Sequence, residues 1–205
     1  MTMYAGNALN LLERALLQTG NLVAGVKPEQ ASLPTPCSGW DVNALLAHMV
    51  VQDLDNFTLA ARAQTPDWAQ MPHVPESDWS STFQARAQAL LSTWREVDPE
   101  VTVAGPGGQD VPLMSRADQQ ITELSVHAWD LARATGQPVE LDSDVASYAL
   151  GWGQHMLRPA YRGPDLAFGA EVPVPEDAPV QDRLAGWFGR DPGWEPASDV
   201  GNVGC

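Results

Sequence analysis

Apolar residues recur at intervals of three and four along several long stretches of this sequence, and that spacing is the period of an amphipathic α-helix. In residues 4–26, for example, Leu9, Leu12, Leu16 and Val23 follow it. Prolines lie between these stretches and separate them, because proline cannot continue a helix. The pattern therefore predicts long helices joined by irregular connections.

The predicted helices each carry one apolar face. Their ranges are 4–26, 40–64, 78–98, 115–135 and 142–157, followed by a short helix over 180–188. Connections rich in proline and glycine lie at 28–39, 65–77 and 159–179, and 101–113 forms a hairpin or an irregular loop. This order predicts an all-α fold, an up-and-down four-helix bundle with extra short C-terminal helices and irregular loops. We expect one domain over residues 1–192 and a flexible tail over 193–205.

The charge balance excludes whole classes of partner. The formal net charge is −15, so the chain has no basic surface that could follow a nucleic acid backbone or adsorb to an anionic membrane. No apolar stretch approaches the roughly 20 residues that span a bilayer. The sequence has no secretory signal pattern, and its only thiols are Cys37 and Cys205, so we expect a cytoplasmic protein.

Three side chains on two predicted helices are candidate metal ligands. Glu123 and His127 are four residues apart, which places their β-carbons about 5–6 Å apart on one helix face. His48 lies on the matching flank of the second helix, in line with Gln52. All three border the apolar stripes, so a carboxylate and two imidazoles can converge on one ion. The alternative is a local Glu123–His127 hydrogen bond and a satisfied histidine at the edge of the core.

Other residues are candidates for binding a substrate. Trp79 and Phe83 border the 65–77 connection, which itself is a candidate flap, and they can line a pocket beside Trp68. Arg86 and Arg116 are candidate clamps for an anionic group, or ordinary solvated charges.

Cys37 precedes a helix start, where the pKa of a thiol can be lowered, although a buried small residue is the commoner role. His73 and His155 are expected at the surface, and Trp40, Trp129 and Trp152 in or beside the core.

Several motifs together resemble a known family. They are the stretch 34–42 (PTPCSGWDV) with 45–48 (LLAH), the stretch 123–132 (ELSVHAWDLA), and a C-terminal segment over 168–192. They are similar to actinobacterial proteins related to the N-terminal domain of mycothiol-dependent maleylpyruvate isomerase, within the DinB/YfiT-like metalloenzyme superfamily.

The resemblance implies a four-helix bundle that holds a divalent metal, usually zinc or nickel, on His48, Glu123 and His127, and a set of two histidines and one glutamate also suits iron. Three protein ligands leave a coordination position open for a thiol or water. The isomerase has a further C-terminal domain that contributes to its active site. We expect no such domain in this chain, so its substrate is not carried over.

The leading hypothesis is a metal-dependent enzyme that uses a metal-bound thiolate or water on a small electrophile, by transfer of a mycothiol-type thiol or by thiol-assisted isomerisation. A metal-dependent hydrolase is one alternative. A non-catalytic metal-binding module for stress or structure is another, and a metal-free bundle that binds a small apolar ligand is a third. In every case we expect a small-molecule partner and a monomer or homodimer.

Overall fold

The computed structural model describes residues 2–69, 72, 78–105, 108–163 and 168–196, with side chains from residue 7 onward. The expectations for His73, for Cys205 and for the tail beyond residue 196 concern positions outside this part of the chain. So does most of the candidate flap over 65–77.

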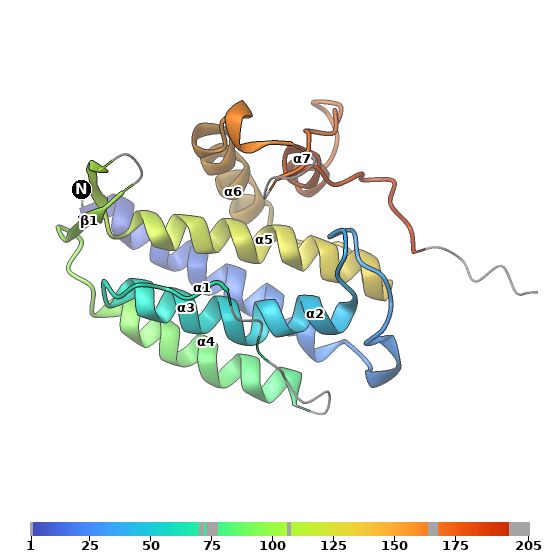
Figure 1. Cartoon of the computed structure of the whole chain (residues 1–205), viewed down its shortest axis with the longest axis horizontal. Coiled ribbons are helices and arrows are strands. Elements are labelled where there is room, and N and C mark those ends of the chain that lie inside the picture. Colours follow the sequence, from blue (N-terminus) through green and yellow to red (C-terminus); the bar gives the residue numbers. More distant parts are fainter. Residues whose placement is uncertain (1, 70–71, 73–77, 106–107, 164–167, 197–205) are drawn as a thin grey trace, which may run out of the picture.

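Four long helical units form the bundle that the sequence predicts (Figure 1). They are α1 (Thr2–Ala24), the second unit made of α2 (Val42–Ala47), η2 (His48–Gln52) and α3 (Asp53–Ala61), α4 (Trp79–Arg95) and α5 (Ser115–Thr135). The core between them is apolar, with Leu12, Phe57 and Trp94 among its fully buried side chains. The all-α prediction is confirmed.

One step of the chain differs from a strictly up-and-down order. Gly20 of α1 faces Phe83 of α4, and Glu13 accepts a hydrogen bond from Arg95, so these two helices are antiparallel. The second unit runs against α5, which itself runs parallel to α1 (Figure 1). Consequently α3 and α4 point in the same direction. Parallel neighbours need a long connection, and residues 62–78 supply it.

Capping residues define the helix ends that position the site. The Asp41 side chain accepts a hydrogen bond from the Ala44 amide at 2.8 Å, which starts α2. Gly136 has φ +68° and ends α5, a left-handed conformation that suits glycine. The Asp142 side chain accepts from the Val145 amide and starts α6.

The second helical unit contains a π-helical turn, which the sequence pattern does not predict. In η2 the Asp53 amide donates to the His48 carbonyl, an i to i+5 bond in place of the usual i to i+4. Residues five apart lie about 140° apart around an α-helix, but a π turn brings them to nearly the same face. The turn therefore places Asp53 beside His48.

Two further helices form a second layer over α5 (Figure 1). They are α6 (Ser143–Met156) and α7 (Val180–Trp187), and the short 3₁₀ turns η1 (Pro28–Gln30) and η4 (Pro159–Tyr161) lie in the connections. Val126 on the outer side of α5 packs with Leu150, Leu184 and Phe188. Trp129 is fully buried, as predicted, and its Nε1 donates to Asp182 at 3.1 Å.

The remaining regular structure is a small hairpin. Strands β1 (Thr102–Ala104) and β2 (Asp110–Pro112) pair antiparallel, with Val103 opposite Val111, which confirms the hairpin alternative for this segment. Among the described residues, no helix is both long and apolar enough to cross a membrane.

Candidate metal centre

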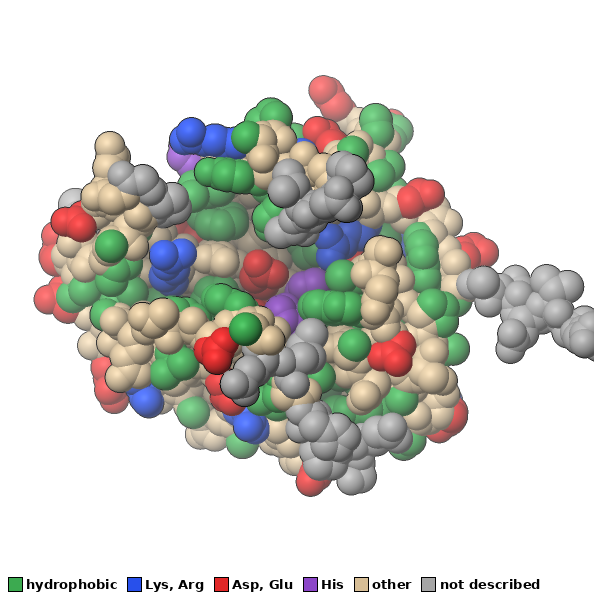
Figure 2. Space-filling view, viewed as in Figure 1, with side chains coloured by type: hydrophobic (Ala, Val, Ile, Leu, Met, Phe, Trp, Pro, Cys, Tyr) green, Lys and Arg blue, Asp and Glu red, His purple; other side chains and the backbone are tan. Residues whose placement is uncertain are grey.

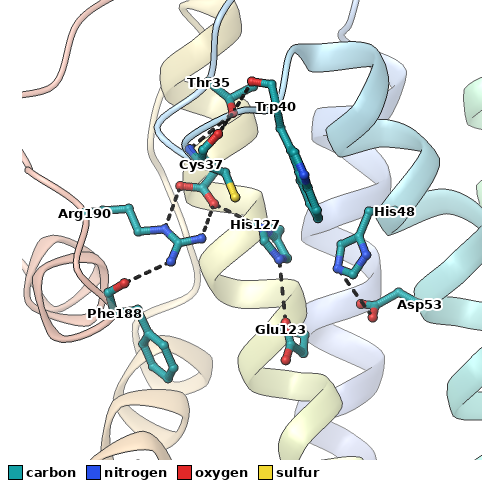
Figure 3. A network of polar contacts seen from close by, with 10 residues as sticks. Thr35, Cys37, Trp40, His48, Asp53, Glu123, His127, Phe188 and Arg190 are labelled. Carbon is teal, nitrogen blue, oxygen red and sulfur yellow. Dashed lines mark hydrogen bonds and ion pairs between the residues drawn. The ribbon is translucent and has the colours of Figure 1, made fainter. Parts of the chain in front are cut away.

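Three side chains from two helical units meet at one point between α5 and the π turn (Figure 3). His48 comes from η2, and Glu123 and His127 come from successive turns of α5. Each offers one ligand atom, and the three atoms lie within 4.8 Å of one another. His127 Nε2 is 3.6 Å from Glu123 Oε2, and the two imidazole rings meet edge to face at 4.9 Å. The convergence expected from the helical phases is therefore present.

The His48 ring is oriented so that its Nε2 is free to bind a cation. Its Nδ1 lies 2.7 Å from Gln52 Oε1, and the Gln52 amide is itself oriented because its Nε2 donates to the Trp68 carbonyl at 3.1 Å. Nδ1 therefore carries the proton and donates it, which leaves a lone pair on Nε2. This Nε2 is buried and has no hydrogen-bond partner among the described residues.

The His127 ring is held in a similar way from the other side. Its Nδ1 lies 3.0 Å from Asp130 Oδ2, and Asp130 is fully buried. Arg190 donates two hydrogen bonds to the Asp130 carboxylate, at 3.2 and 3.0 Å. In histidines that bind a metal through one ring nitrogen, the other ring nitrogen commonly contacts a carboxylate. His127 has this arrangement, because its Nδ1 contacts Asp130 while its Nε2 faces Glu123.

The two histidines and Glu123 strongly affect one another's pKa values. Burial acts to lower the pKa of His127, but hydrogen bonds to Asp130 and Glu123 outweigh it and raise the pKa to about 9. Burial, with the nearby His127 charge, lowers the pKa of His48 to about 4. The pKa of Glu123 is lowered by His127 despite burial. The site thus holds a positive charge between its carboxylates, which a metal ion can supply in place of the proton.

Asp53 lies beside this cluster, and sequence reasoning missed it. The residue is 1% exposed, and its Oδ1 lies 3.7 Å from His48 Nε2. Burial raises the pKa of its carboxyl well above the ordinary value, and nearby Glu123 adds to the effect. On an α-helix Asp53 would point away from His48, so only the π turn reveals the pairing.

A pocket of about 320 Å³ opens on the cluster. Its walls combine apolar and polar side chains, namely Cys37, Trp40, Gln119, Thr122, Val126, Trp152, Phe168, Phe188 and Arg190. Figure 2 shows the hollow, with histidine beside an acidic side chain in its floor. Trp40 lies against both imidazole rings, at 4.9 Å from His48 and 5.9 Å from His127.

The loop before α2 places Trp40 and Cys37 at this pocket. The buried Thr35 hydroxyl bonds to the Trp40 carbonyl at 2.9 Å and fixes the turn (Figure 3). Burial raises the pKa of the Cys37 thiol, although Arg190 opposes the shift. The thiol is therefore protonated at neutral pH, which does not favour a nucleophilic role.

The four residues expected to bind substrate lie elsewhere. Trp79 is 4% and Phe83 is 2% exposed, and both pack in the core because they lie on the inward face of α4. Arg86 forms an ion pair with Asp55 at 3.0 Å on the surface.

Arg116 lines a second pocket, of about 400 Å³, together with Trp68 and Gln119. Gln119 also lines the pocket at the cluster, so the two pockets are neighbours along α5.

Comparisons with known proteins identify the family. The model of the mycothiol maleylpyruvate isomerase N-terminal domain matches residues 12–132. Two relatives from Mycobacterium tuberculosis, "Uncharacterized protein Rv0738" of strain ATCC 25618 / H37Rv and "Uncharacterized protein MT0763" of strain CDC 1551 / Oshkosh, are each 33% identical over 178 residues. Each alignment covers 82% of this chain and 90% of the relative.

Two solved structures have a similar fold. The crystal structure of a mycothiol-dependent maleylpyruvate isomerase matches with a TM-score of 0.55 and 16% identity, over 70% of this chain and 67% of that one. A mutant of a mycothiol-dependent maleylpyruvate isomerase matches with a TM-score of 0.54 at the same identity, over 73% and 67%. The family match and these folds agree with the motifs around the cluster, and the chain belongs to the mycothiol maleylpyruvate isomerase N-terminal domain family, a DinB-like group of helical bundles.

Proposed function

We propose that this protein is a metal-dependent enzyme that activates a low-molecular-weight thiol of the mycothiol type and adds it to a small electrophile. The product is either the thiol adduct or, after elimination of the thiol, an isomer of the substrate. The observation that carries the proposal is the cluster of His48, Glu123 and His127, whose ligand atoms lie within 4.8 Å of one another at the floor of a pocket.

The donor set fits a divalent cation. Two neutral imidazole nitrogens and one carboxylate suit zinc best among common metals, with nickel or iron as alternatives. Gln52 and Asp130 orient the two rings before any cation arrives, so little reorganisation is needed. When bound, the cation lowers the pKa of a thiol or a water molecule that coordinates it.

The remaining side chains define where the reactants lie. Trp40 and Phe188 give the pocket apolar walls, which exclude bulk water and strengthen the electrostatic attraction of a thiolate to the site. Thr122 and Gln119 add polar side chains to the lining of the pocket. A site of this kind, with ligands facing a pocket, favours catalysis over a closed structural role.

Metal content per chain, determined by elemental mass spectrometry on protein without an affinity tag, tests the proposal first. We expect about one zinc or nickel per chain, and strong loss in His48→Ala, Glu123→Ala and His127→Ala. His155→Ala, which changes an exposed histidine on α6, is the matched control and retains the metal. Full occupancy in all three cluster variants would overturn the proposed site.

The thiol step is tested with a spectroscopic probe. Cobalt(II) replaces the native metal, and a thiol that enters the first coordination sphere produces intense sulfur-to-metal charge-transfer absorption. We expect this absorption with mycothiol, followed by turnover when a chromogenic aryl halide is added as electrophile. A cobalt spectrum indifferent to thiols, with hydrolysis of an ester instead, would assign the site to water activation.

A further inference from the structure

Asp53 is a buried carboxylate without a hydrogen-bond partner. It is 1% exposed, and neither oxygen accepts a hydrogen bond from any described residue. Among the described residues, its nearest ionisable contact is His48 Nε2 at 3.7 Å, which is too long for a hydrogen bond. A buried negative charge in this state is costly, so the Asp53 carboxyl group stays protonated until a cation binds beside it.

The π turn is what directs this carboxylate at the cluster. The bond from the Asp53 amide to the His48 carbonyl turns the Asp53 side chain toward the imidazole (Figure 3). π turns inserted in α-helices are uncommon and recur at functional sites. The π turn therefore places the Asp53 carboxylate beside His48, while the Glu123 carboxylate lies beside His127.

Two pairwise distances at the site are close to the spacing of ligands on one cation. Two ligands bound tetrahedrally to zinc at about 2.0–2.1 Å lie about 3.4 Å apart. His127 Nε2 and Glu123 Oε2 are 3.6 Å apart, and His48 Nε2 and Asp53 Oδ1 are 3.7 Å apart. Each histidine in the cluster therefore has a carboxylate oxygen at nearly the spacing of two ligands on one ion.

We propose that Asp53 is a second carboxylate of the cation site and helps to hold the metal together with His48, Glu123 and His127. This inference rests on the proposed metal site. Two carboxylates neutralise a divalent cation, so the loaded centre carries no net charge. A neutral centre discriminates against monovalent cations and retains a divalent one more tightly than a single carboxylate does.

Zinc affinity, measured by competition with a chromophoric chelator, tests the role of Asp53. We expect Asp53→Asn to weaken zinc binding at least tenfold. Asp55→Asn is the matched control, because Asp55 is exposed on the same helix and pairs with Arg86, and its affinity equals that of the wild type. Equal affinity of Asp53→Asn and wild type would overturn the inference while leaving the metal site intact. Absence of zinc binding by the wild type would overturn both.

Thermal unfolding with and without zinc separates this role from a purely structural one. Without metal, we expect Asp53→Asn to melt at or above the temperature of the wild type, because a neutral amide of the same size replaces a buried carboxyl group that makes no hydrogen bond with the described residues. With zinc, its rise in melting temperature is smaller than that of the wild type. A metal-free variant that melts well below the wild type and shows the full zinc-induced rise contradicts the proposal.

Discussion

His127 lies between two carboxylates, Asp130 and Glu123, and this position links its charge to the stability of the metal-free protein. The folded pKa of about 9 exceeds the ordinary value of 6.5. A raised histidine pKa stabilises the fold fully below pH 6.5, and this stabilisation is lost as the pH rises through 9.

We therefore expect the free energy of unfolding, measured by urea titration in the presence of a chelator, to fall by about 1–3 kcal/mol between pH 6.5 and 9. His127→Gln, which cannot carry the charge, serves as the control and shows a flatter profile over this range. Wild-type stability that stays constant or increases over the same range would show that the imidazole is neutral in the folded state.

Gln52 orients His48 for the proposed metal, because it contacts Nδ1, the ring nitrogen opposite the proposed ligand atom. Gln52→Leu keeps the approximate side-chain volume and removes the acceptor, so the ring loses its preferred tautomer and orientation. We expect zinc affinity to fall about 10–100-fold, as is usual when a partner of a ligating histidine is removed. The chelator competition measures it, and Gln88→Leu, at an exposed position of α4, should leave the affinity unchanged.

At this scale the sequence predicts part of the site. Helical phase alone places Glu123 and His127 on one face and His48 on a facing flank, because α5 is regular and His48 directly follows the regular α2. Asp53 escapes the same reasoning because its direction depends on a π turn. The burial of Trp79 and Phe83 is not predicted, because the proline-rich connection next to them suggests a pocket border, whereas their own helix phase turns them inward.

Among the elements, α5 is the one that the sequence predicts best. Its expected range of 115–135 equals the observed one. The helical spacing of apolar residues begins after the 101–113 segment and marks the start, and Gly136 marks the end. The second helical unit is predicted as a single helix over 40–64, and neither its π turn nor its later start at Val42 follows from periodicity. The parallel course of α3 and α4 also depends on the path of the 62–78 connection, and hydrophobic periodicity within the helices does not predict that path.

Asp142 joins α6 to the bundle in two separable ways. Its carboxylate caps α6 through the amides of Asp144 and Val145, and it also accepts two hydrogen bonds from Arg14. We expect Asp142→Ala to lower the free energy of unfolding by about 1–2 kcal/mol, since both contacts are lost.

Asp142→Asn isolates the cap, because asparagine caps helices as well as aspartate does but carries no charge. We expect it to lose less than half as much stability in the same urea titration. An equal loss in the two variants would mean that the Arg14 ion pair, and not the cap, dominates at this junction.

Across the whole molecule, the two helical layers are joined at the site by a buried ion pair. Arg190 lies after α7, Asp130 lies on α5, and their side chains are 13% and 0% exposed. Arg190→Gln removes one of the two charged partners of the buried Asp130 and leaves His127 as the other, so we expect a loss of about 2–4 kcal/mol in the free energy of unfolding.

The same change should weaken zinc binding, because Asp130 then holds His127 less firmly. Arg95→Gln removes a surface pair with Glu13, whose partners are more than half exposed, and we expect it to cost less than about 1 kcal/mol. Similar losses in the two variants would show that the Arg190 contact contributes no more than an exposed pair.

The Arg190–Asp130 contact also sets an order of events during synthesis. Sixty residues separate the two partners, so His48, Glu123, His127 and Asp130 have all left the ribosome well before Arg190 is added. A nascent or prematurely terminated chain carries every ligand but lacks the guanidinium that balances Asp130. We therefore expect a chain that ends before residue 190 to hold the proposed metal more weakly than the full chain, because Asp130 then orients His127 without the Arg190 ion pair.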